Sequence, residues 1–364
     1  MIKIRFCPEC VVPKQVTGQY RWLNSGVIVQ STDMTRRVGL IESENLDPVY
    51  IAIGEIIGVS IDRLVTDSVR KGTVEYITNI IPPGMRDMIQ KGQMPIESIT
   101  EALIVNAHLN GFGKFELVDF LYEKNDDDFE IINVTDPFSL PLCAGVHAGA
   151  CEAVTDRPNE VIYAEVFPGV YEFTAFICEH AGELEERLQA KGHHHREGDI
   201  YLERCPTCGG PKQLSGFKWD LDNGKITNAQ TKKRMVLIGP EVQDPLFEEL
   251  EKELGNNIPS IVVEAQRRFV KWGFFSMPEV GDHGELRNQL ALRGLGDLRE
   301  IKMGAQGMSM RVDNAANHLL TVGIAQGYFE RAFDIRSHVE WELSVEGDLL
   351  VEATPQRITA AVTI

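Results

Sequence analysis

The chain has 364 residues, of which 43% are hydrophobic and 25% are charged, and its formal net charge is −18. This length favours two domains over one, and the negative charge excludes general nucleic-acid binding, because phosphate contacts require basic surface. No apolar run is long enough for a membrane helix, and the first residues lack the apolar core of a signal peptide. We therefore expect a cytoplasmic protein that binds neither nucleic acid nor membranes.

The first half of the chain predicts a cysteine knuckle followed by helices and strands in a definite order. The knuckle is Cys7-Pro8-Glu9-Cys10. Asp47-Pro48 supplies the cap and the first-turn proline of a helix that ends near Gly58. Apolar residues at helical spacing from Ile61 to Val69 indicate a second helix. The other expected elements are a strand at 37–41, a strand at 115–120, a glycine-marked helix at 143–152 and a hairpin of strands 161–165 and 170–173.

The second half repeats these signals in the same order. A second knuckle, Cys205-Pro206-Thr207-Cys208, begins 198 positions after the first. The later pairs are Leu40 with Leu237, Asp47 with Asp244 and Gly58 with Gly255 (offset 197), Gly111 with Gly294 (offset 183), and Gly145, Gly149 and Glu152 with Gly323, Gly327 and Glu330 (offset 178). So many anchors in one order make coincidence improbable, so the sequence predicts an internal duplication.

The order of the elements predicts the fold class. Helices followed by paired strands, without strict strand–helix–strand alternation, favour an α+β fold with antiparallel sheets. We expect two tandem copies of an antiparallel-sheet-plus-helices ligand-binding domain, related by internal duplication. The predicted boundaries are 1–183 for the first repeat, 184–198 for a linker and 199–364 for the second repeat.

The two knuckles are the strongest chemical signal in the sequence. A CPxC turn directs both sulfurs toward one ion, and a cation stabilises them as thiolates. Each knuckle supplies two ligands, whereas a closed structural zinc site needs four. We therefore expect Cys7, Cys10, Cys205 and Cys208 to converge on one zinc ion that ties the repeats together.

Other interpretations of the knuckles stay open at this point. Each knuckle could complete its own metal site with histidines, of which the run His193-His194-His195 is nearest in sequence. A thioredoxin-like redox role is a further alternative, although neither cysteine pair lies in a strand–helix–strand context.

Cys143, His147 and Cys151 form a second group of chemically active residues. Their spacing of four places them along one face of a helix. The second repeat has Thr321, Ala325 and Phe329 at these positions, so the polar character belongs to the first repeat alone. This face either lines a pocket, with His147 as a ligand or an acid–base group, or simply packs, with the cysteines as small apolar residues.

The glycine-marked helices and the hairpins that follow them resemble the 4-vinyl reductase domain family. In the first repeat the resemblance rests on residues 143–152 and 161–173, and in the second on residues 323–330, 339–343 and 347–349. The family pattern is G-x-x-x-G and an acidic residue on a helix, then a strand hairpin. It implies a fold built around a pocket for a small apolar ligand, a fold shared with haem-based nitric-oxide sensors and a vesicle-tethering subunit.

The resemblance also has a departure that concerns metal binding. Sensory members of the family carry a metal site made by a cysteine before the helix, a glutamate in the first hairpin strand and cysteines around the hairpin. Cys143 and Glu165 fit the first two places, but Pro168 and residues 170–173 stand where the hairpin cysteines are expected. We therefore expect the family's own zinc site to be missing, and the word reductase implies no activity here.

These observations favour a binding or sensor-type protein that contains zinc and holds a small apolar or aromatic molecule, acting through a partner protein. Candidate ligand-binding residues are Cys143, Gly145, His147, Gly149 and Cys151, and no catalytic residue is assigned. The alternative is an enzyme or an enzyme-accessory factor that uses the Cys/His pocket of the first repeat on an aromatic or thioester substrate in anaerobic metabolism.

Overall fold

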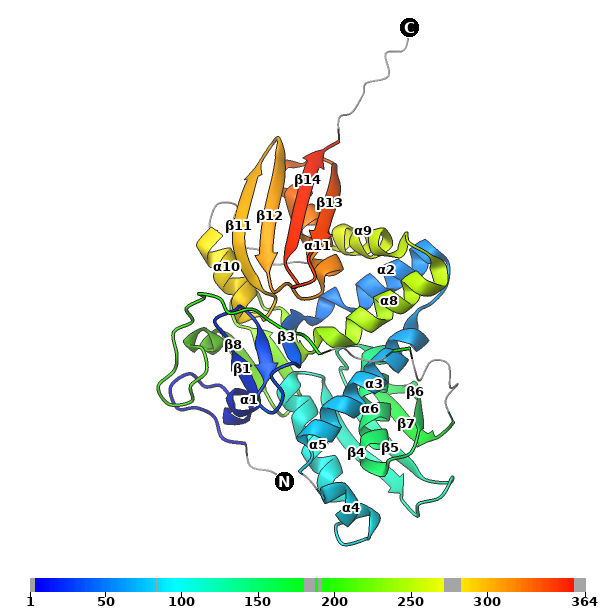
Figure 1. Ribbon diagram of the computed structural model, residues 1–364. Coiled ribbons are helices and arrows are strands. Elements are labelled where there is room, and N and C mark those ends of the chain that lie inside the picture. The colour runs from blue at the N-terminus through cyan, green and yellow to red at the C-terminus, as the bar shows by residue number, and fades with distance from the viewer. Residues whose placement is uncertain (1–3, 83, 180–186, 189–191, 272–282, 357–364) are drawn as a thin grey trace.

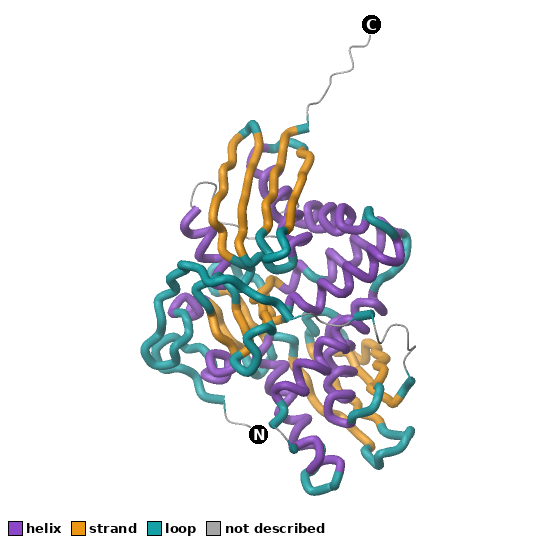
Figure 2. The backbone as a smooth tube through the Cα atoms, in the orientation of Figure 1, coloured by secondary structure: helices purple, strands orange, loops and turns teal. Residues whose placement is uncertain are grey.

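The computed structural model describes residues 4–82, 84–179, 187–188, 192–271 and 283–356 (Figure 1). Its strands form three antiparallel sheets, which Figure 2 shows as three separate groups with helices beside them. The chain is therefore an α+β protein, as the sequence predicted. None of the helices in the described part of the chain combines the length and the apolar character that crossing a membrane requires.

The elements of the first half follow the predicted order. They are α1 (Lys14–Gln19), β1 (Tyr20–Trp22), β2 (Ile28–Gln30), β3 (Arg37–Glu42), η1 (Ser43–Asn45), α2 (Asp47–Ile57), α3 (Asp62–Ile80), α4 (Met85–Gln90), α5 (Glu97–Asn110), β4 (Lys114–Leu121), β5 (Phe129–Thr135), α6 (Leu140–Thr155), β6 (Asn159–Phe167) and β7 (Val170–Ile177).

The second half contains a closely similar series. It consists of η2 (Lys212–Gly216), β8 (Phe217–Asp220), β9 (Lys225–Asn228), β10 (Arg234–Ile238), η3 (Pro240–Val242), α8 (Gln243–Leu254), α9 (Ile258–Lys271), α10 (His283–Leu292), β11 (Asp297–Gly304), β12 (Gly307–Asp313), α11 (His318–Phe333), β13 (Ser337–Leu343) and β14 (Leu349–Pro355).

Local sequence explains where the main helices begin and end. Helix α2 has Pro48 in its first turn and ends at Gly58, whose φ of 82° is a conformation that glycine adopts without steric cost. Helix α6 begins after Ser139, whose side chain accepts a hydrogen bond from the backbone N–H of Leu142. The second residue of the helix is Pro141, which has no backbone N–H, and a first-turn N–H would have no acceptor within the helix. The helix boundaries predicted at Asp47 and Gly58 are confirmed.

Two sheet-plus-helix units share one topology. The strand orders are β4-β5-β7-β6 in the first unit and β11-β12-β14-β13 in the second. Helix α3 packs on α6 in the first, and α9 packs on α11 in the second. The register is also equivalent, since Glu130 faces Ala175 and Met308 faces Ala353. The repeated organisation is therefore observed, and an internal duplication remains our interpretation of it.

A six-stranded sheet of order β1-β2-β3-β10-β9-β8 joins the two halves of the chain. At its centre β3 pairs antiparallel with β10, and Leu40 lies opposite Leu237, its own counterpart in the repeat. Both leucines are almost completely buried. Because equivalent residues face each other, a local twofold axis passes between these two strands.

Segments of each half pack into the other half around this axis. The indole nitrogen of Trp22 donates to the carbonyl oxygen of Leu292, and that of Trp219 donates to Leu109, at 2.9 and 3.1 Å. Helix α2 of the first half packs on α9, and α8 of the second half packs on α3 (Figure 1). The two halves are thus intertwined: each four-stranded sheet comes from one half, and a helix of the other half packs on the helices beside it.

The boundaries predicted at 183/184 and 198/199 divide the sequence repeat, and they stay a prediction. Much of the predicted linker 184–198 lies outside the described residues, which include only 187–188 and 192–198 of it. In that described part, the His193 Nε2 atom lies 3.4 Å from a carboxylate oxygen of Asp244.

The glycines of the G-x-x-x-G motif allow helices to approach closely. A Cβ atom placed on Gly145 would lie 2.5 Å from the Thr66 carbonyl oxygen, and one on Gly149 would lie 2.3 Å from the Arg70 carbonyl oxygen. Gly323 and Gly327 meet α9 in the same way. These glycines therefore bring α6 against α3 and α11 against α9.

The acidic residue of the same motif joins the helix pair to the final hairpin. Glu152 accepts hydrogen bonds from the Arg70 guanidinium at 2.8 and 3.0 Å and from the backbone N–H of Asn159 at 3.4 Å. In the second unit Glu330 accepts from Arg267 and from the backbone N–H of Ser337. The motif that carries the family resemblance thus has a structural role in both units.

We predict that Gly149→Ala lowers the free energy of unfolding by about 3 kcal/mol, because its new methyl group meets the backbone of α3 and the helices must separate. Gly18→Ala is the matched control. Gly18 lies in α1, and no heavy atom stands within 4 Å of the place that a Cβ atom would take there, so this change should cost nothing and gain up to about 1 kcal/mol. Urea denaturation followed by circular dichroism measures both, and equal effects would contradict the packing role.

Candidate functional site

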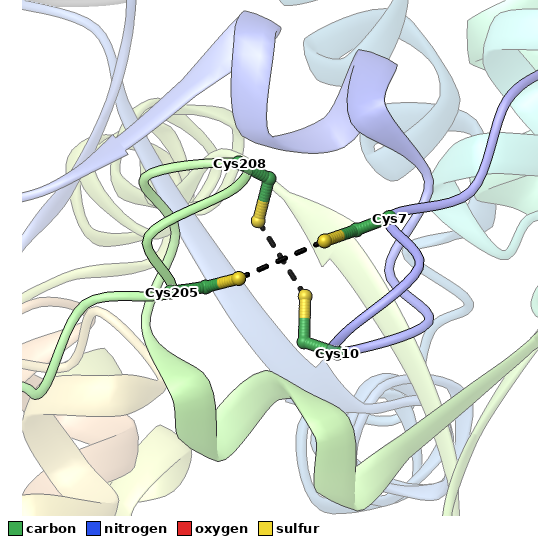
Figure 3. Close-up of side chains that lie close together, drawn as sticks. All are labelled: Cys7, Cys10, Cys205 and Cys208. Atoms are coloured by element: carbon green, nitrogen blue, oxygen red, sulfur yellow. Dashed lines mark hydrogen bonds between the residues drawn. The ribbon is translucent and has the colours of Figure 1, made fainter.

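The two knuckles bring four cysteines to one point on the local twofold axis. Figure 3 shows the four sulfur atoms pointing toward one another, two from each knuckle. The Cys7 and Cys205 sulfurs are 3.6 Å apart, and those of Cys10 and Cys208 are 3.4 Å apart. The four sulfur atoms all lie within 4.8 Å of one another. Each close pair joins two equivalent residues of the repeat.

Backbone hydrogen bonds shape each knuckle in the same way. The N–H of Cys7 donates to the Val12 carbonyl oxygen, and the N–H of Val11 donates back to Cys7 at 3.0 Å. The second knuckle repeats the pair, with Cys205 donating to Gly210 and Gly209 donating to Cys205. The tight turns fix both sulfurs of each knuckle on the inner side of the loop.

The donor set fits a metal ion. Four thiolates around a tetrahedral zinc ion, with Zn–S bonds of about 2.3 Å, lie about 3.8 Å from one another, close to the observed separations. The backbone N–H of Cys10 lowers the pKa of the Cys7 thiol to about 7, whereas burial raises the pKa of the Cys10 thiol to about 12. A cation would hold all four as thiolates. The cluster could therefore hold a metal ion, and its ligands within the described residues are cysteines only.

One residue of the first knuckle has an unfavourable backbone conformation. Val11 has a φ of 57°, in the left-handed region that β-branched residues rarely adopt. Gly209 occupies the equivalent place in the second knuckle with a φ of 74°, and open space surrounds it. The Val11 side chain is 64% exposed, so packing does not compensate for this strain.

We predict that Val11→Gly raises the free energy of unfolding by about 1 kcal/mol, because it removes the left-handed strain of a β-branched residue. Gly209→Val should lower it by about the same amount, since it introduces that strain into the second knuckle. Thermal denaturation of the two variants beside the parent chain measures both effects. A loss of stability in Val11→Gly would show that the turn does not carry this strain.

The first unit contains a partly open cavity of about 160 Å³. Helices α3, α5 and α6 and strands β4 and β5 form most of its wall, and strand β10 of the second half contributes Leu237 and Ile238. The wall is mainly apolar, and it includes Val69, Ile77, Leu103, Phe115, Ile132, Val146 and Val154. A strand from the second half of the chain therefore helps to build the cavity of the first unit.

A buried polar cluster made by Glu130, His147, Cys151 and Thr100 forms one part of this wall. The Glu130 carboxylate lies 3.0 Å from His147 Nε2, and it accepts from the Cys151 thiol at 3.3 Å. Thr100 donates to its other oxygen at 2.9 Å. The ligand atoms of Glu130, His147 and Cys151 lie within 4.8 Å of one another.

The polar cluster alters the ionisation of its members. Burial opposes the charged form of Glu130, but hydrogen bonds from His147, the charge of His147 and the bonds from Cys151 and Thr100 together hold its pKa below the ordinary value. Burial, and then the negative charge of Glu130, raise the pKa of the Cys151 thiol well above its ordinary value. The pKa shifts thus favour the charged form of Glu130 and the neutral form of the Cys151 thiol.

The structure separates the ligand-binding residues expected from the sequence. His147 and Cys151 line the cavity, but Cys143 does not, since it is fully buried and its thiol lies 3.7 Å from the Phe112 carbonyl oxygen. Gly145 and Gly149 contact α3 and are not among the cavity-lining residues.

Sequence reasoning missed Glu130, which is the centre of the polar cluster. It lies on β5, 17 residues before His147, and nothing in its local spacing links it to the helix. A second polar region of the wall was also missed. There the Tyr20 hydroxyl donates to Asn110 at 2.8 Å, and the Tyr76 hydroxyl lies 3.2 Å from the Asn106 amide nitrogen.

The residues expected for the metal site of the 4-vinyl reductase family do not meet. Glu165 accepts a hydrogen bond from the backbone N–H of Gly169 at 2.9 Å, on the exposed hairpin, while Cys143 is buried at the base of α6. Neither belongs to a group of potential metal ligands within the described residues.

The second unit has apolar residues where the first has its polar cluster. Met308, Ala325 and Phe329 occupy the places of Glu130, His147 and Cys151, and all three are buried. The fully buried Phe329 ring stacks at a tilt against Phe333, with the ring centres 5.4 Å apart. The same scaffold therefore carries a buried polar cluster in the cavity wall of one unit and apolar packing at the equivalent positions of the other.

No protein-family model and no curated protein matches this chain. Solved structures that resemble it include an H-NOX domain from Cs with 4-cyano-L-phenylalanine at site 5 (18% identity, 35% of this chain, 78% of that chain, TM-score 0.26). Another, from work on heme distortion in the H-NOX family, has 17% identity, covers 33% of this chain and 73% of that chain, and has a TM-score of 0.24. A third, a mutant H-NOX of T. Tengcongensis, has 16% identity, covers 33% of this chain and 75% of that chain, and has a TM-score of 0.24. TM-scores this low do not establish a shared fold.

Proposed function

We propose that this chain is a zinc-containing, sensor-type protein that binds a small apolar or aromatic molecule in the cavity of its first unit. The observation that carries the proposal is the cavity itself, which has a largely apolar wall and a few convergent polar groups, the usual composition of a small-molecule site. Its volume of about 160 Å³ is close to the roughly 150 Å³ that suffices to hold benzene. A single-ring aromatic or a short aliphatic molecule is therefore the expected ligand.

The resemblance to the 4-vinyl reductase domain family supports the same proposal. In both units the glycines of its motif bring two helices together, and the acidic residue joins that helix pair to the final hairpin. We propose that both units are members of this family, and that the ligand binds in the cavity of the first unit.

In our proposal the four-cysteine cluster holds a structural zinc ion. Four thiolates close the coordination sphere and leave no position for a substrate. The ion would fix the two knuckles together in the apolar cluster that also contains Val38 of β3 and Leu237 of β10, and both of these residues reach the cavity wall. Zinc binding would thereby stabilise the scaffold that shapes the pocket.

The geometry does not favour the enzymatic alternative with a cysteine nucleophile. Burial raises the pKa of the Cys143 thiol to about 12, and burial with the Glu130 charge raises that of Cys151. An active cysteine nucleophile requires a lowered pKa or an adjacent base that removes its proton. The Cys151 thiol instead donates to Glu130, whose own pKa is held low.

The partner protein expected from the sequence is also part of the proposal. The edge strand β6 of the first unit carries the exposed apolar side chains Ile162, Val166 and Phe167, with exposed fractions of 62%, 40% and 69%. The equivalent places of Ile162 and Val166 in the second unit are Glu340 and Ser344. The β6 edge is therefore the surface to test first for binding of a partner.

We predict that toluene and 4-methylphenol bind the parent chain, and that Ala150→Tyr abolishes this binding. Ala150 lines the cavity on α6, and Tyr328 is its counterpart on α11, so the helix accepts this larger side chain in the repeat. Isothermal titration calorimetry measures the binding, with Tyr328→Ala as the matched control that should bind as the parent does. Binding that survives Ala150→Tyr, or is lost in Tyr328→Ala, would place the ligand elsewhere.

We predict that Cys7→Ser and Cys205→Ser each remove one zinc ion per chain and lower the melting temperature by more than about 5 °C, because one missing thiolate opens the closed site. Inductively coupled plasma mass spectrometry of the untagged chain measures the zinc content, and Cys178→Ser serves as the control cysteine outside the cluster. Unchanged zinc content in both variants would show that the knuckles do not share an ion.

A further inference from the structure

We infer that Glu130, His147 and Cys151 form a second metal site, separate from the four-cysteine cluster, with three protein ligands and an open coordination position on the cavity. These residues lie in the wall of the cavity, on β5 and α6. The metal assignment stands on this cluster alone, whereas the consequence for the ligand rests on the proposed function of the cavity.

The positions of the donor atoms suit a single ion. The Glu130 Oε2 atom is 3.0 Å from His147 Nε2 and 3.3 Å from Cys151 Sγ. Ligand atoms around a zinc ion, at bonds of about 2.0 to 2.3 Å, are separated by roughly 3 to 4 Å. The three atoms can therefore bind one ion after small side-chain adjustments, because His147 and Cys151 lie one turn apart on the same helix face.

The second observation is an unused nitrogen on the histidine. The His147 side chain is 4% exposed, and its Nδ1 atom is buried without a hydrogen-bond partner among the described residues. A buried histidine that serves only packing has its polar atoms satisfied, since each unsatisfied one costs free energy. An ion bound at Nε2 would place the ring proton on Nδ1, where a water or the molecule in the cavity would have to accept it.

Thr100 supports the carboxylate as an outer partner of a metal site does. Its hydroxyl donates to Glu130 Oε1 at 2.9 Å and so leaves Oε2 directed at the histidine and the thiol. Hydrogen bonds of this kind orient ligating carboxylates in metal sites. The second unit, where Met308, Ala325 and Phe329 stand in place of the three ligands, cannot bind an ion there.

The chemistry of the donors indicates the ion. Zinc is commonly bound by carboxylate oxygens, imidazole nitrogens and thiolates, and this site offers one of each. Three protein ligands with one open position are characteristic of catalytic zinc sites, whereas structural sites have four protein ligands. On binding, the Cys151 thiol releases its proton to solvent, and the thiolate electron pair forms the bond to the metal. The open position would then take a donor atom of the molecule in the cavity, so its ligand is an apolar molecule with a single carboxylate, phenolate or thiolate group.

The test is a cobalt titration of the demetallated full-length chain. After gel filtration, the parent chain should retain two cobalt ions. The double variant Cys7→Ser/Cys205→Ser should retain one, and its thiolate-to-cobalt charge-transfer absorption should have the intensity expected for a single sulfur ligand. His147→Ala and Cys151→Ser should each retain one ion, now with four-sulfur absorption. Adding His147→Ala to the double knuckle variant should leave none.

Cys143→Ser is the matched control, because Cys143 lies on the same helix but neither belongs to the polar cluster nor lines the cavity. It should retain two ions. One ion in the parent, or two in both His147→Ala and Cys151→Ser, would overturn the second site. Circular dichroism confirms that each variant is folded, and an ion bound by the His193–His195 run would be present in all variants alike.

Failure of the metal site and failure of the proposed binding function are distinguishable. Ala150→Tyr should lose toluene but keep two cobalt ions. In the parent, 4-methylbenzoate should change the cobalt absorption of the His147 site and should not do so in Cys151→Ser. Two ions without any toluene binding would preserve the metal site and reject the apolar pocket, and toluene binding with one ion would do the reverse.

Discussion

The antiparallel pairing of β3 with β10 is the contact on which the rest of the molecule depends. It places Leu40 opposite Leu237 and fixes the local twofold axis that relates the two halves of the chain. The same axis brings the knuckles together, so the closest sulfur pairs join equivalent cysteines. Because helix α2 packs on α9 and α8 packs on α3, separating the halves would expose the core of both four-stranded units.

This shared construction lets the two units diverge without loss of the scaffold. In both, glycines bring two helices into contact, and a glutamate pairs with an arginine and holds the first residue of the hairpin. The units differ in the side chains that the strand and the helix direct toward the interior. Glu130, His147 and Cys151 belong to a cavity wall, whereas Met308, Ala325 and Phe329 complete an apolar core. Strand β10 of the six-stranded sheet lines the cavity of the first unit, so the second half of the chain still contributes to that cavity.

The sequence predicted the repeated order of elements, the antiparallel α+β class and the convergence of the four cysteines, because fixed sequence offsets and metal-ligand motifs are strong local signals. It did not predict the exchange of α2 and α8, because a repeat does not reveal whether its copies pack side by side or intertwine. The spacing of four predicts that Cys143 lies beside His147 and Cys151. Each step of four residues rotates a helix by about 40°, however, so over two steps Cys143 turns toward Phe112. Glu130 carries no local signal, since a sheet register brings it to α6.

Anomalous X-ray diffraction at the zinc edge, from crystals of the chain as purified, tests this account most directly. The account predicts one strong peak equidistant from the sulfurs of Cys7, Cys10, Cys205 and Cys208. It also predicts a second peak between Glu130 and Cys151, with none near Phe329. Absence of a peak among the four cysteines, with their sulfurs joined as disulfides, would contradict the central claim that one ion ties the halves of the chain together.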